Sequence, residues 1–456
     1  MTAAAKKASF GSVDMLNGPI FRALIIFAIP IFISNVFQQM YNTVDTMIVG
    51  HVLGDSSLAA IGSCGAIFDF LVGFAMGLSN GLTIVTARSY GSGDENMVKK
   101  SVAGSLIIGL GTSLAMTVIG YFGLYPLLKL LKTPADIIDE AYSYAAVVTL
   151  FLMVTFAYNL CSGLMRAIGN SVMPLVFLIV SSVLNILLDL LFIARLDMGV
   201  FGAGVATVIS QAVSVVLCLV YVFWKVPMLI PSRKHFKMDA DMYKDLLGQG
   251  YSMMVMNCIV SVGTVILQYG INGMGTLVIA GHTAGRKMYM FFNMPIMAMT
   301  VSCSTFVSQN KGANQGKRII QCLKCSFLFD ILCAVVITVF LFFAARPLVA
   351  LVSGSSEAVV LNNGTLYLRV VGPFYAVLGV LLQSRSSLQG IGQKVLPLIS
   401  SVIEFIGKIV FVIVFIPRFQ YLAVAFCEPV IWCCMAAQLL FCLVRDPYLK
   451  EARKMA

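Results

Sequence analysis

Long runs without a charged residue divide the chain, and their lengths predict its secondary structure. Uncharged runs cover residues 23–44, 101–128, 141–165, 167–188, 198–224 and 288–310. Each is long enough for a helix that crosses a membrane, which needs about 20 mainly apolar residues. The run 246–285 is too long for one helix, and Gly270, Gly273 and Gly275 predict a turn inside it. The pattern predicts twelve transmembrane helices, at about 20–48, 57–86, 98–124, 135–161, 169–194, 199–224, 246–270, 277–307, 319–345, 357–386, 394–417 and 421–445.

The composition excludes an ordinary water-soluble fold. Of the 456 residues, 59% are hydrophobic and 11% are charged, and the mean hydropathy is +0.93. Soluble domains carry about 25% charged residues, so this chain has too few charges to cover an aqueous surface. We therefore expect an all-α membrane protein.

The positively charged residues predict the orientation of the helices. Cytoplasmic loops of membrane proteins carry an excess of Lys and Arg. If the N-terminus is cytoplasmic, most of the 31 Lys and Arg fall in cytoplasmic loops. The remainder are Lys129, Lys132, Arg195, Arg346, Arg369 and Arg418 in outer loops, and Arg286, Lys287 and Lys408 at membrane depth. Both termini are thus predicted to be cytoplasmic. The net charge of +11 then reflects this bias and attraction to anionic membrane lipid, and no nucleic-acid partner is expected.

A sequence repeat divides the chain into two halves. Residues 167–175 (AIGNSVMPL) recur as 390–398 (GIGQKVLPL), and the same spacing of about 223 pairs Arg195 with Arg418. Each half would contain six of the twelve predicted helices. Because six is an even number, both halves begin on the same side of the membrane. We expect two six-helix bundles related by a pseudo-two-fold axis along the membrane normal, as in carriers that rock around a central cleft. The predicted segments are a cytoplasmic N-terminus (1–19), an N-lobe (20–224), a cytoplasmic linker (225–245), a C-lobe (246–445) and a cytoplasmic C-terminus (446–456).

Acidic residues at membrane depth are the strongest candidates for function, because burying a charge there is costly. Asp45 lies in the first predicted helix. Asn185 and Asp189 lie in the fifth, and their i, i+4 spacing places them on one face. Two carboxylates in one low-dielectric pocket titrate as a unit. Such a pair can cycle a proton or hold Na⁺; the alternative is a purely structural role.

Other charges at membrane depth are weaker candidates. Asp69 and Asp330 each interrupt an apolar helix. Glu404 and Lys408 are spaced i, i+4 and are expected to form a structural ion pair. Arg286 is expected to face a C-lobe cleft or to pair with an acid such as Glu428.

Missing motifs argue against enzymes. The chain has no Gly-x-x-x-x-Gly-Lys-Ser/Thr loop for ATP and no His-Glu-x-x-His. We expect no catalytic residue, no metal cofactor and no other cofactor; the twelve Cys lie mainly in apolar runs and suggest no disulfide framework.

Several motifs together resemble the multidrug and toxic-compound extrusion (MATE) family of transporters, in its prokaryotic form. The similarity covers the whole chain, in the order and spacing of its motifs. They are residues 41–46 (YNTVDT), 91–94 (GSGD), 166–169 (RAIG), 185–189 (NILLD) and 202–207 (GAGVAT).

The resemblance implies an ion-coupling pocket in the N-lobe, made of Asp45, Asn185, Asp189 and Thr207. These four residues would take H⁺ as the coupling ion, or Na⁺. Neighbouring polar residues implied for the pocket are Tyr41, Tyr144, Asn159 and Gln38. Pro30 falls where some members bend their first helix. Val260 and Leu378 fall about where other members carry C-lobe acids, so a cation site in the C-lobe is not expected.

We therefore expect a secondary active multidrug efflux transporter in the cell (inner) membrane. It would export amphipathic, often cationic, organic compounds in exchange for H⁺ or Na⁺ by alternating access, and we expect a monomer. The alternative is a lipid-linked saccharide flippase of a related family. A flippase needs several cations in the cleft, and here only Arg286, Lys287 and Arg385 are candidates. An intramembrane enzyme or a receptor is a remoter possibility.

Overall fold

The computed structural model describes residues 11–130, 133–134, 137–237 and 239–454. Lys132, most of the predicted segment 1–19 and the last two residues of 446–456 lie outside this part. Within the described residues the chain is almost entirely helical and forms no named strand; one isolated antiparallel bridge joins Ser12 and Asn170. The all-α fold expected from the sequence is confirmed.

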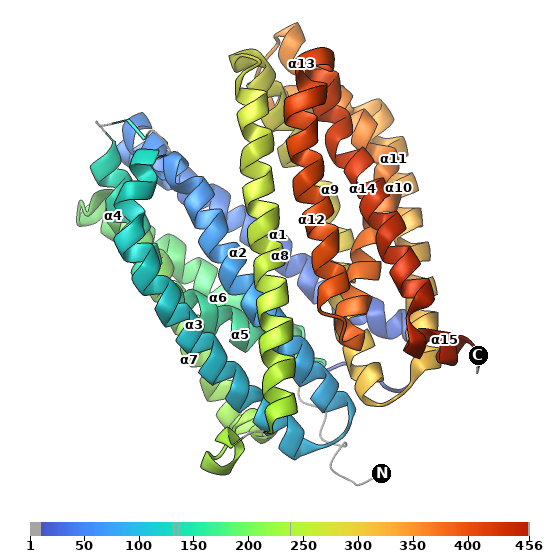
Figure 1. The fold of residues 1–456 in the computed structure, drawn as a ribbon. Helices are drawn as coiled ribbons and strands as arrows, with labels where there is room; N and C mark the ends of the chain where they lie inside the picture. Colours follow the sequence, from blue (N-terminus) through green and yellow to red (C-terminus); the bar gives the residue numbers. More distant parts are fainter. Residues whose placement is uncertain (1–10, 131–132, 135–136, 238, 455–456) are drawn as a thin grey trace. The chain divides into compact units, whose positions relative to one another are not determined.

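The described residues up to Asn272 form eight α-helices (Figure 1). They are α1 (Ile20–Leu53), α2 (Asp55–Gly91), α3 (Glu95–Leu130), α4 (Ile138–Leu150), α5 (Leu152–Ala167), α6 (Val172–Asp189), α7 (Gly199–Lys225) and α8 (Ala240–Asn272). Two short 3₁₀ turns, η3 (Pro227–Leu229) and η4 (Arg233–Phe236), lie between α7 and α8.

The rest of the described chain forms five long α-helices and two short ones, α13 and α15. They are α9 (Thr276–Gly312), α10 (Gly316–Ser353), α11 (Ala358–Ile391), α12 (Val395–Val410), α13 (Ile416–Phe419), α14 (Tyr421–Arg445) and α15 (Pro447–Lys454). Eleven described helices or helix combinations are long and apolar enough to cross a membrane, and the bent pair α4 and α5 makes up to twelve.

The predicted helix 135–161 is wrong as a single element. The chain breaks at Phe151, and α4 and α5 meet at an angle of 49°. No Pro or Gly marks this position, so the break has no local sequence signal and arises from packing.

The repeat is visible as a shared irregularity in the backbone. A π-helical turn, η2 (Leu190–Arg195), follows α6, and a second one, η5 (Phe411–Phe415), follows α12. The two turns lie at corresponding places in the repeat of about 223 residues. A widened turn of this kind is rare and commonly occurs at functional sites, so its presence in both halves supports a common origin.

The described chain groups into two compact units. Of the described residues, those in 11–14 and 33–257 make up unit 1, and those in 15–32 and 258–454 make up unit 2. The predicted lobes divide in the linker 225–245, whereas the units divide inside α1 and α8. Both helices therefore continue from one unit into the other, and the change of unit in α1 follows Pro30 by two residues.

Each unit turns apolar side chains outward, as a lipid solvent requires. On α10, Leu332, Val336 and Phe343 are 57%, 68% and 75% exposed, while Ser326 and Asp330 on the same helix are fully buried. The hydrophobic stripe of this helix thus faces outward and its polar stripe faces the helices of its own unit.

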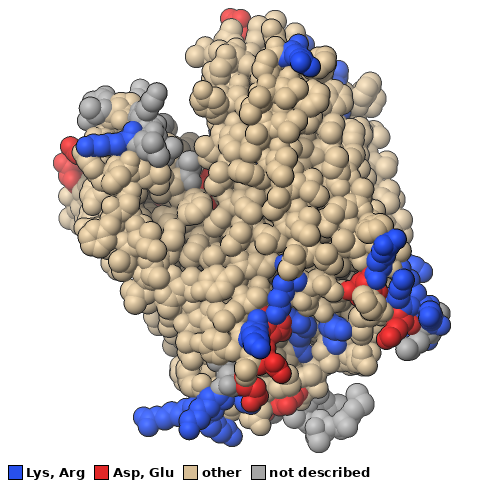
Figure 2. Space-filling model, viewed as in Figure 1, with Lys and Arg blue, Asp and Glu red and all other residues tan. Residues whose placement is uncertain are grey.

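Charged side chains gather at one end of each unit. On the face seen in Figure 2, most Lys and Arg side chains lie near the α2–α3 turn and the linker of unit 1 and near α15 of unit 2, and a few lie at the opposite end of each unit. The intervening helices show few charges on this face, consistent with spans in a hydrocarbon layer.

Small residues let α2 and α8 pack backbone to backbone within unit 1. A Cβ added to Gly81 would lie 2.3 Å from the carbonyl oxygen of Gln249, and one added to Gly77 would lie 2.6 Å from that of Met253. The amide of Asn257 donates to the carbonyl oxygen of Gly73 at 3.1 Å. Gly73, Gly77 and Gly81 thus have the packing role that small residues have in membrane helices.

We predict that Gly81→Ala destabilises the protein, because the added methyl group collides with backbone that cannot yield easily. Overpacking of this kind costs about 1–3 kcal/mol. Gly62→Ala on the same helix is the matched control, since nothing lies within 4 Å of its added Cβ. Thermal unfolding in detergent should show a lower midpoint for Gly81→Ala only; equal midpoints would contradict the close approach.

Candidate functional site

Two carboxyl groups meet inside unit 1. Asp45 lies on the part of α1 that belongs to this unit, and Asp189 is the last residue of α6 before the π-helical turn. The two side chains are within hydrogen-bonding contact of each other. The structure thus brings together two of the predicted ion-coupling residues from distant parts of the sequence.

Neither carboxyl group has a cation to neutralise it. Asp189 is fully buried, and both its oxygens, together with Oδ1 of Asp45, have no donor in good hydrogen-bonding geometry among the described residues. Two ionised carboxylates in contact repel each other. A single proton between them makes one carboxyl a donor and removes both the repulsion and one buried charge.

Asn185 completes this buried face of α6. It lies one turn before Asp189 and is 2% exposed, and neither amide atom has a partner in good geometry in the described part of the chain. Its amide can therefore donate to a ligand and accept from one. Thr207 on α7 is different, because its hydroxyl donates to the carbonyl oxygen of Ala203 at 3.1 Å. No hydrogen bond between described residues joins Thr207 to the acid pair.

Tyrosines surround the pair. Tyr144 of α4 is 7% exposed and interacts electrostatically with Asp45, Asp189 and Tyr41. The side chain of Tyr41 in turn contacts that of Gln38, one turn earlier on α1. The predicted polar residues Tyr41, Tyr144 and Gln38 are therefore linked to the acid pair.

α5 contributes further polar groups. The amide of Asn159 donates to the carbonyl oxygen of Thr155 at 2.8 Å, and the hydroxyl of Thr155 donates to Gln211 on α7 at 2.9 Å. Tyr158 interacts with Tyr41 and with Arg166. Sequence reasoning missed Thr155, Tyr158 and Gln211, since a lone polar residue in an apolar helix gives no signal of the side it faces.

Two acids of unit 2, Glu428 and Glu404, pair with cations. Arg286 of α9 forms an ion pair with Glu428 of α14 at 3.2 Å, and Glu428 also accepts from the hydroxyl of Tyr367 at 2.9 Å. The ion pair of Lys408 with Glu404 measures 2.8 Å, with the i, i+4 geometry expected from the sequence. These charges are therefore compensated locally, in contrast to the pair in unit 1.

The remaining candidates have different settings. Asp69 is exposed on α2. Pro30 lies inside α1, and the helix continues through it. Asp330 is buried in unit 2.

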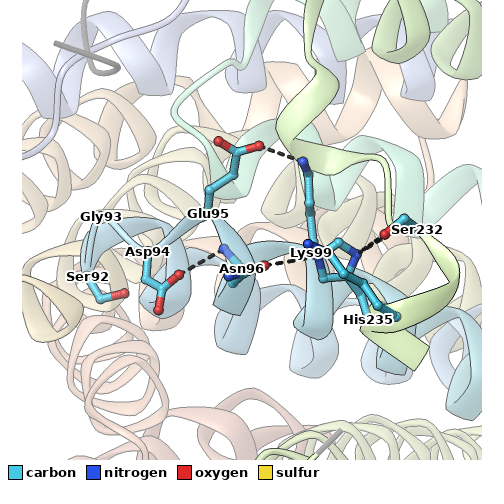
Figure 3. Close-up of a pocket in the computed structure, with 9 residues that line it drawn as sticks. Ser92, Gly93, Asp94, Glu95, Asn96, Lys99, Ser232 and His235 are labelled. Atoms are coloured by element: carbon cyan, nitrogen blue, oxygen red, sulfur yellow. Dashed lines mark hydrogen bonds and ion pairs between the residues drawn. The ribbon is translucent and has the colours of Figure 1, made fainter. Parts of the chain in front are cut away.

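A separate pocket of about 710 Å³ opens where the linker meets the α2–α3 turn (Figure 3). His235 of η4 is 3% exposed, and its Nδ1 accepts from the backbone N–H of Ser232 at 2.9 Å. Nε2 therefore carries the ring proton and donates to Oδ1 of Asn96 on α3 at 3.1 Å. This contact fastens the linker to α3. The pocket is lined by Ser92, Gly93, Asp94, Glu95, Asn96, Lys99, Ser232, Lys234 and His235.

An ion pair fastens the same linker at a second point. Lys100 of α3 lies 2.9 Å from Asp239, and this hydrogen bond and charge hold the pKa of Asp239 below its usual value. The contribution of the pair is present at neutral pH and is lost as the pH falls through this lowered pKa. Both side chains reach solvent, so salt screens the interaction.

We predict that His235→Ala loosens the linker, because it removes the contact with both Ser232 and Asn96. Hydrogen–deuterium exchange of residues 226–237 should become faster. Lys99→Ala is the matched control: Lys99 lines the same pocket but pairs only within its own helix, with Glu95 at 2.6 Å. Exchange that is unchanged in His235→Ala would show that the ring does not hold the linker.

Comparison with known proteins gives consistent matches over most of the chain. The model of the family described as MatE matches residues 30–191 and again residues 252–414, in agreement with the repeat. The probable multidrug resistance protein YpnP of Bacillus subtilis (strain 168) is 27% identical over 394 residues, covering 86% of this chain and 87% of the relative. The multidrug export protein MepA of Staphylococcus saprophyticus is 22% identical over 449 residues, covering 94% of each.

The fold also matches solved structures. The crystal structure of MATE in the bent conformation superposes with a TM-score of 0.88 at 21% identity, covering 97% of this chain and 98% of that one. At this identity the match supports the fold: twelve membrane helices in two bundles.

Proposed function

The chain belongs to the MatE family, and from this premise we propose that it is a secondary active transporter that exports amphipathic, often cationic, organic compounds in exchange for H⁺ by alternating access. The observation that carries the proposal is the contact between the half-buried Asp45 and the fully buried Asp189, which has no cationic partner among the described residues. The names of the relatives YpnP and MepA support multidrug compounds as the substrates.

The geometry of the pair favours H⁺ over Na⁺. The carboxyls are already in hydrogen-bonding contact, which suits a shared proton. A hard cation prefers a fuller shell of oxygen ligands. Among the described residues no group of three or more His, Cys, Asp or Glu is placed to hold a metal ion, and the hydroxyl of Thr207 is engaged within its own helix.

Coupled exchange of proton and substrate follows if both bind at the acid pair and each promotes release of the other. A ligand shifts a conformational equilibrium only by its differential affinity for the two states. A proton on the pair favours contact between α1 and α6. A cationic substrate favours ionised carboxylates, so proton binding promotes substrate release and substrate binding promotes proton release. This reciprocity is the thermodynamic requirement for coupling.

Pro30 is the proposed hinge in α1. Proline removes one hydrogen bond of the helix and crowds the preceding turn, so the helix bends there more easily than elsewhere. The change of unit falls two residues later, and Asp45 lies farther along the same helix. Protonation of the pair can thus act on the portion of α1 that follows Pro30.

We place the protein in the cell (inner) membrane, with both termini in the cytoplasm. The excess of Lys and Arg in one set of loops supports this orientation. No cofactor and no catalytic step are needed for the proposed transport, and a monomer suffices because the chain itself carries both halves of the repeat.

The alternative, a lipid-linked saccharide flippase, has less support. Of the three candidate cations, Arg286 is neutralised by Glu428, which leaves Lys287 and Arg385. Few uncompensated cations are thus left for a pyrophosphate group.

A first prediction concerns orientation. A reporter fused at Met198, between η2 and α7, should be extracytoplasmic, and one at Phe236 in η4 should be cytoplasmic. Enzymatic reporters that are active on only one side of the membrane test both positions. The reverse pattern would invert the proposed topology and the direction of export.

A second prediction concerns the acid pair. Asp45→Asn and Asp189→Asn should each reduce gradient-driven efflux from proteoliposomes to background while the protein stays folded and binds substrate. The amide keeps the size and hydrogen bonding of a protonated carboxyl but cannot release a proton. Efflux is measured separately under pH and Na⁺ gradients, so that coupling to Na⁺ alone would overturn the assignment to H⁺.

Glu404→Gln is the control for this experiment. Its acid is paired with Lys408, and the amide oxygen of Gln still accepts from that ammonium. Coupled efflux should mostly persist. Near-normal coupling in either aspartate variant, or its loss in folded Glu404→Gln, would move the coupling site away from the acid pair.

A further inference from the structure

Among the described residues of unit 2, the fully buried acid Asp330 of α10 has neither an ion pair nor a hydrogen-bond donor in good geometry. Asp446, also buried without an ion pair, accepts hydrogen bonds from Gln393 and from the backbone N–H of Leu449. Glu404 and Glu428 each form an ion pair. The transport scheme proposed above makes no use of Asp330.

The side chain of Asp330 is enclosed by α11 and α9. A Cβ added to Gly379 of α11 would lie 2.5 Å from Cβ of Asp330 and 2.8 Å from its Oδ2, so only glycine fits opposite the carboxyl. Gln383, one turn further along α11, interacts with the carboxyl through its amide and is itself fully buried. The titratable groups that face Asp330 are the thiols of Cys303 on α9 and Cys333 on α10.

This close packing suits a proton and not a metal ion. An ionised carboxylate buried without a partner is so costly that the group neutralises instead. A cation would need room for itself and several oxygen ligands, whereas α11 lies directly against the carboxyl and the described residues contain no metal-binding group. A proton needs no cavity.

Buried hydroxyl and thiol groups extend from Asp330 toward one end of the unit. Ser326 lies one turn before Asp330 on α10, and its hydroxyl contacts Sγ of Cys303 at 3.6 Å. Sγ of Cys303 also contacts the hydroxyl of Ser387 at 3.5 Å and Sγ of Cys322 at 3.7 Å. Cys322 lies within about two turns of the start of α10. Ser326, Cys303, Ser387 and Cys322 thus form a row of buried groups that leads toward the turn between α9 and α10.

We propose that Asp330 is a second proton-binding site, which exchanges its proton with water at the end of unit 2 where α9 ends and α10 begins. One carboxylate oxygen gains a proton from that water and returns it by the same route. Each hydroxyl or thiol of the row accepts one proton and donates another, so it ends unchanged. This site goes beyond the proposed function and does not depend on Asp45 or Asp189.

The test uses infrared spectroscopy on the full-length protein with Asp45→Asn and Asp189→Asn, in lipid nanodiscs at neutral pH. A protonated carboxyl gives a carbonyl stretch that shifts in D₂O. We expect this band in the double variant and its loss when Asp330→Asn is added. Gln383→Leu should shift the band by removing the amide partner, and it provides an independent assignment if Asp330→Asn does not fold.

The route is tested by the rate of the D₂O shift. Ser326→Ala and Ser387→Ala should slow it, whereas Thr338→Val, two turns past Asp330 on the same helix, should leave it unchanged. A band that remains in Asp330→Asn, or that does not shift in Gln383→Leu, would overturn the assignment of the protonated carboxyl to Asp330. A band that never responds to D₂O would show a sealed structural carboxyl, and slowing only in Thr338→Val would place the exchange at the other end.

Discussion

The contact between two carboxyl groups, of the half-buried Asp45 and the fully buried Asp189, is the constraint on which the account of this protein depends. In water two such groups would both be ionised and separate. Near a low-dielectric interior, two like charges about 4 Å apart repel by about 4 kcal/mol at an effective dielectric constant of 20. The contact therefore persists only while a proton, or another cation, is present. It links the ionisation state of the site to the position of α1 against α6.

The two halves of the chain share their backbone plan but differ in their charges. The π-helical turns after α6 and α12 occupy corresponding places in the repeat. Yet the residue that corresponds to Asn185 is Lys408, which is neutralised by Glu404. Compensated charge in unit 2 stabilises structure and resists ionisation changes. Uncompensated acid in unit 1 responds to the proton, which explains how a symmetric plan can contain an asymmetric coupling site.

The sequence was sufficient for the parts of the fold that depend on periodic, local signals. Uncharged runs located the spans, and i, i+4 spacing predicted the ion pair of Glu404 with Lys408. Spacing alone could not show that Asp45 meets Asp189, because they lie on helices far apart in the chain. Their association in one pocket followed only from the family resemblance.

Features that depend on tertiary packing were not predictable. The break at Phe151 and the π-helical turns have no Pro or Gly that marks them within the helices. His235 is one of three scattered histidines in the sequence, and only the fold brings it to Asn96. The change of unit inside α1 likewise depends on which helices the two portions contact.

The central claim is that substrate and proton exclude each other at the acid pair. It is tested most directly by adding a lipophilic organic cation, such as tetraphenylphosphonium, to the purified protein in weakly buffered detergent solution and recording the pH. The account predicts proton release that saturates with substrate binding and disappears in Asp45→Asn/Asp189→Asn. Binding of the same cation to the wild-type protein without proton release, verified by calorimetry in the same buffer, would contradict it.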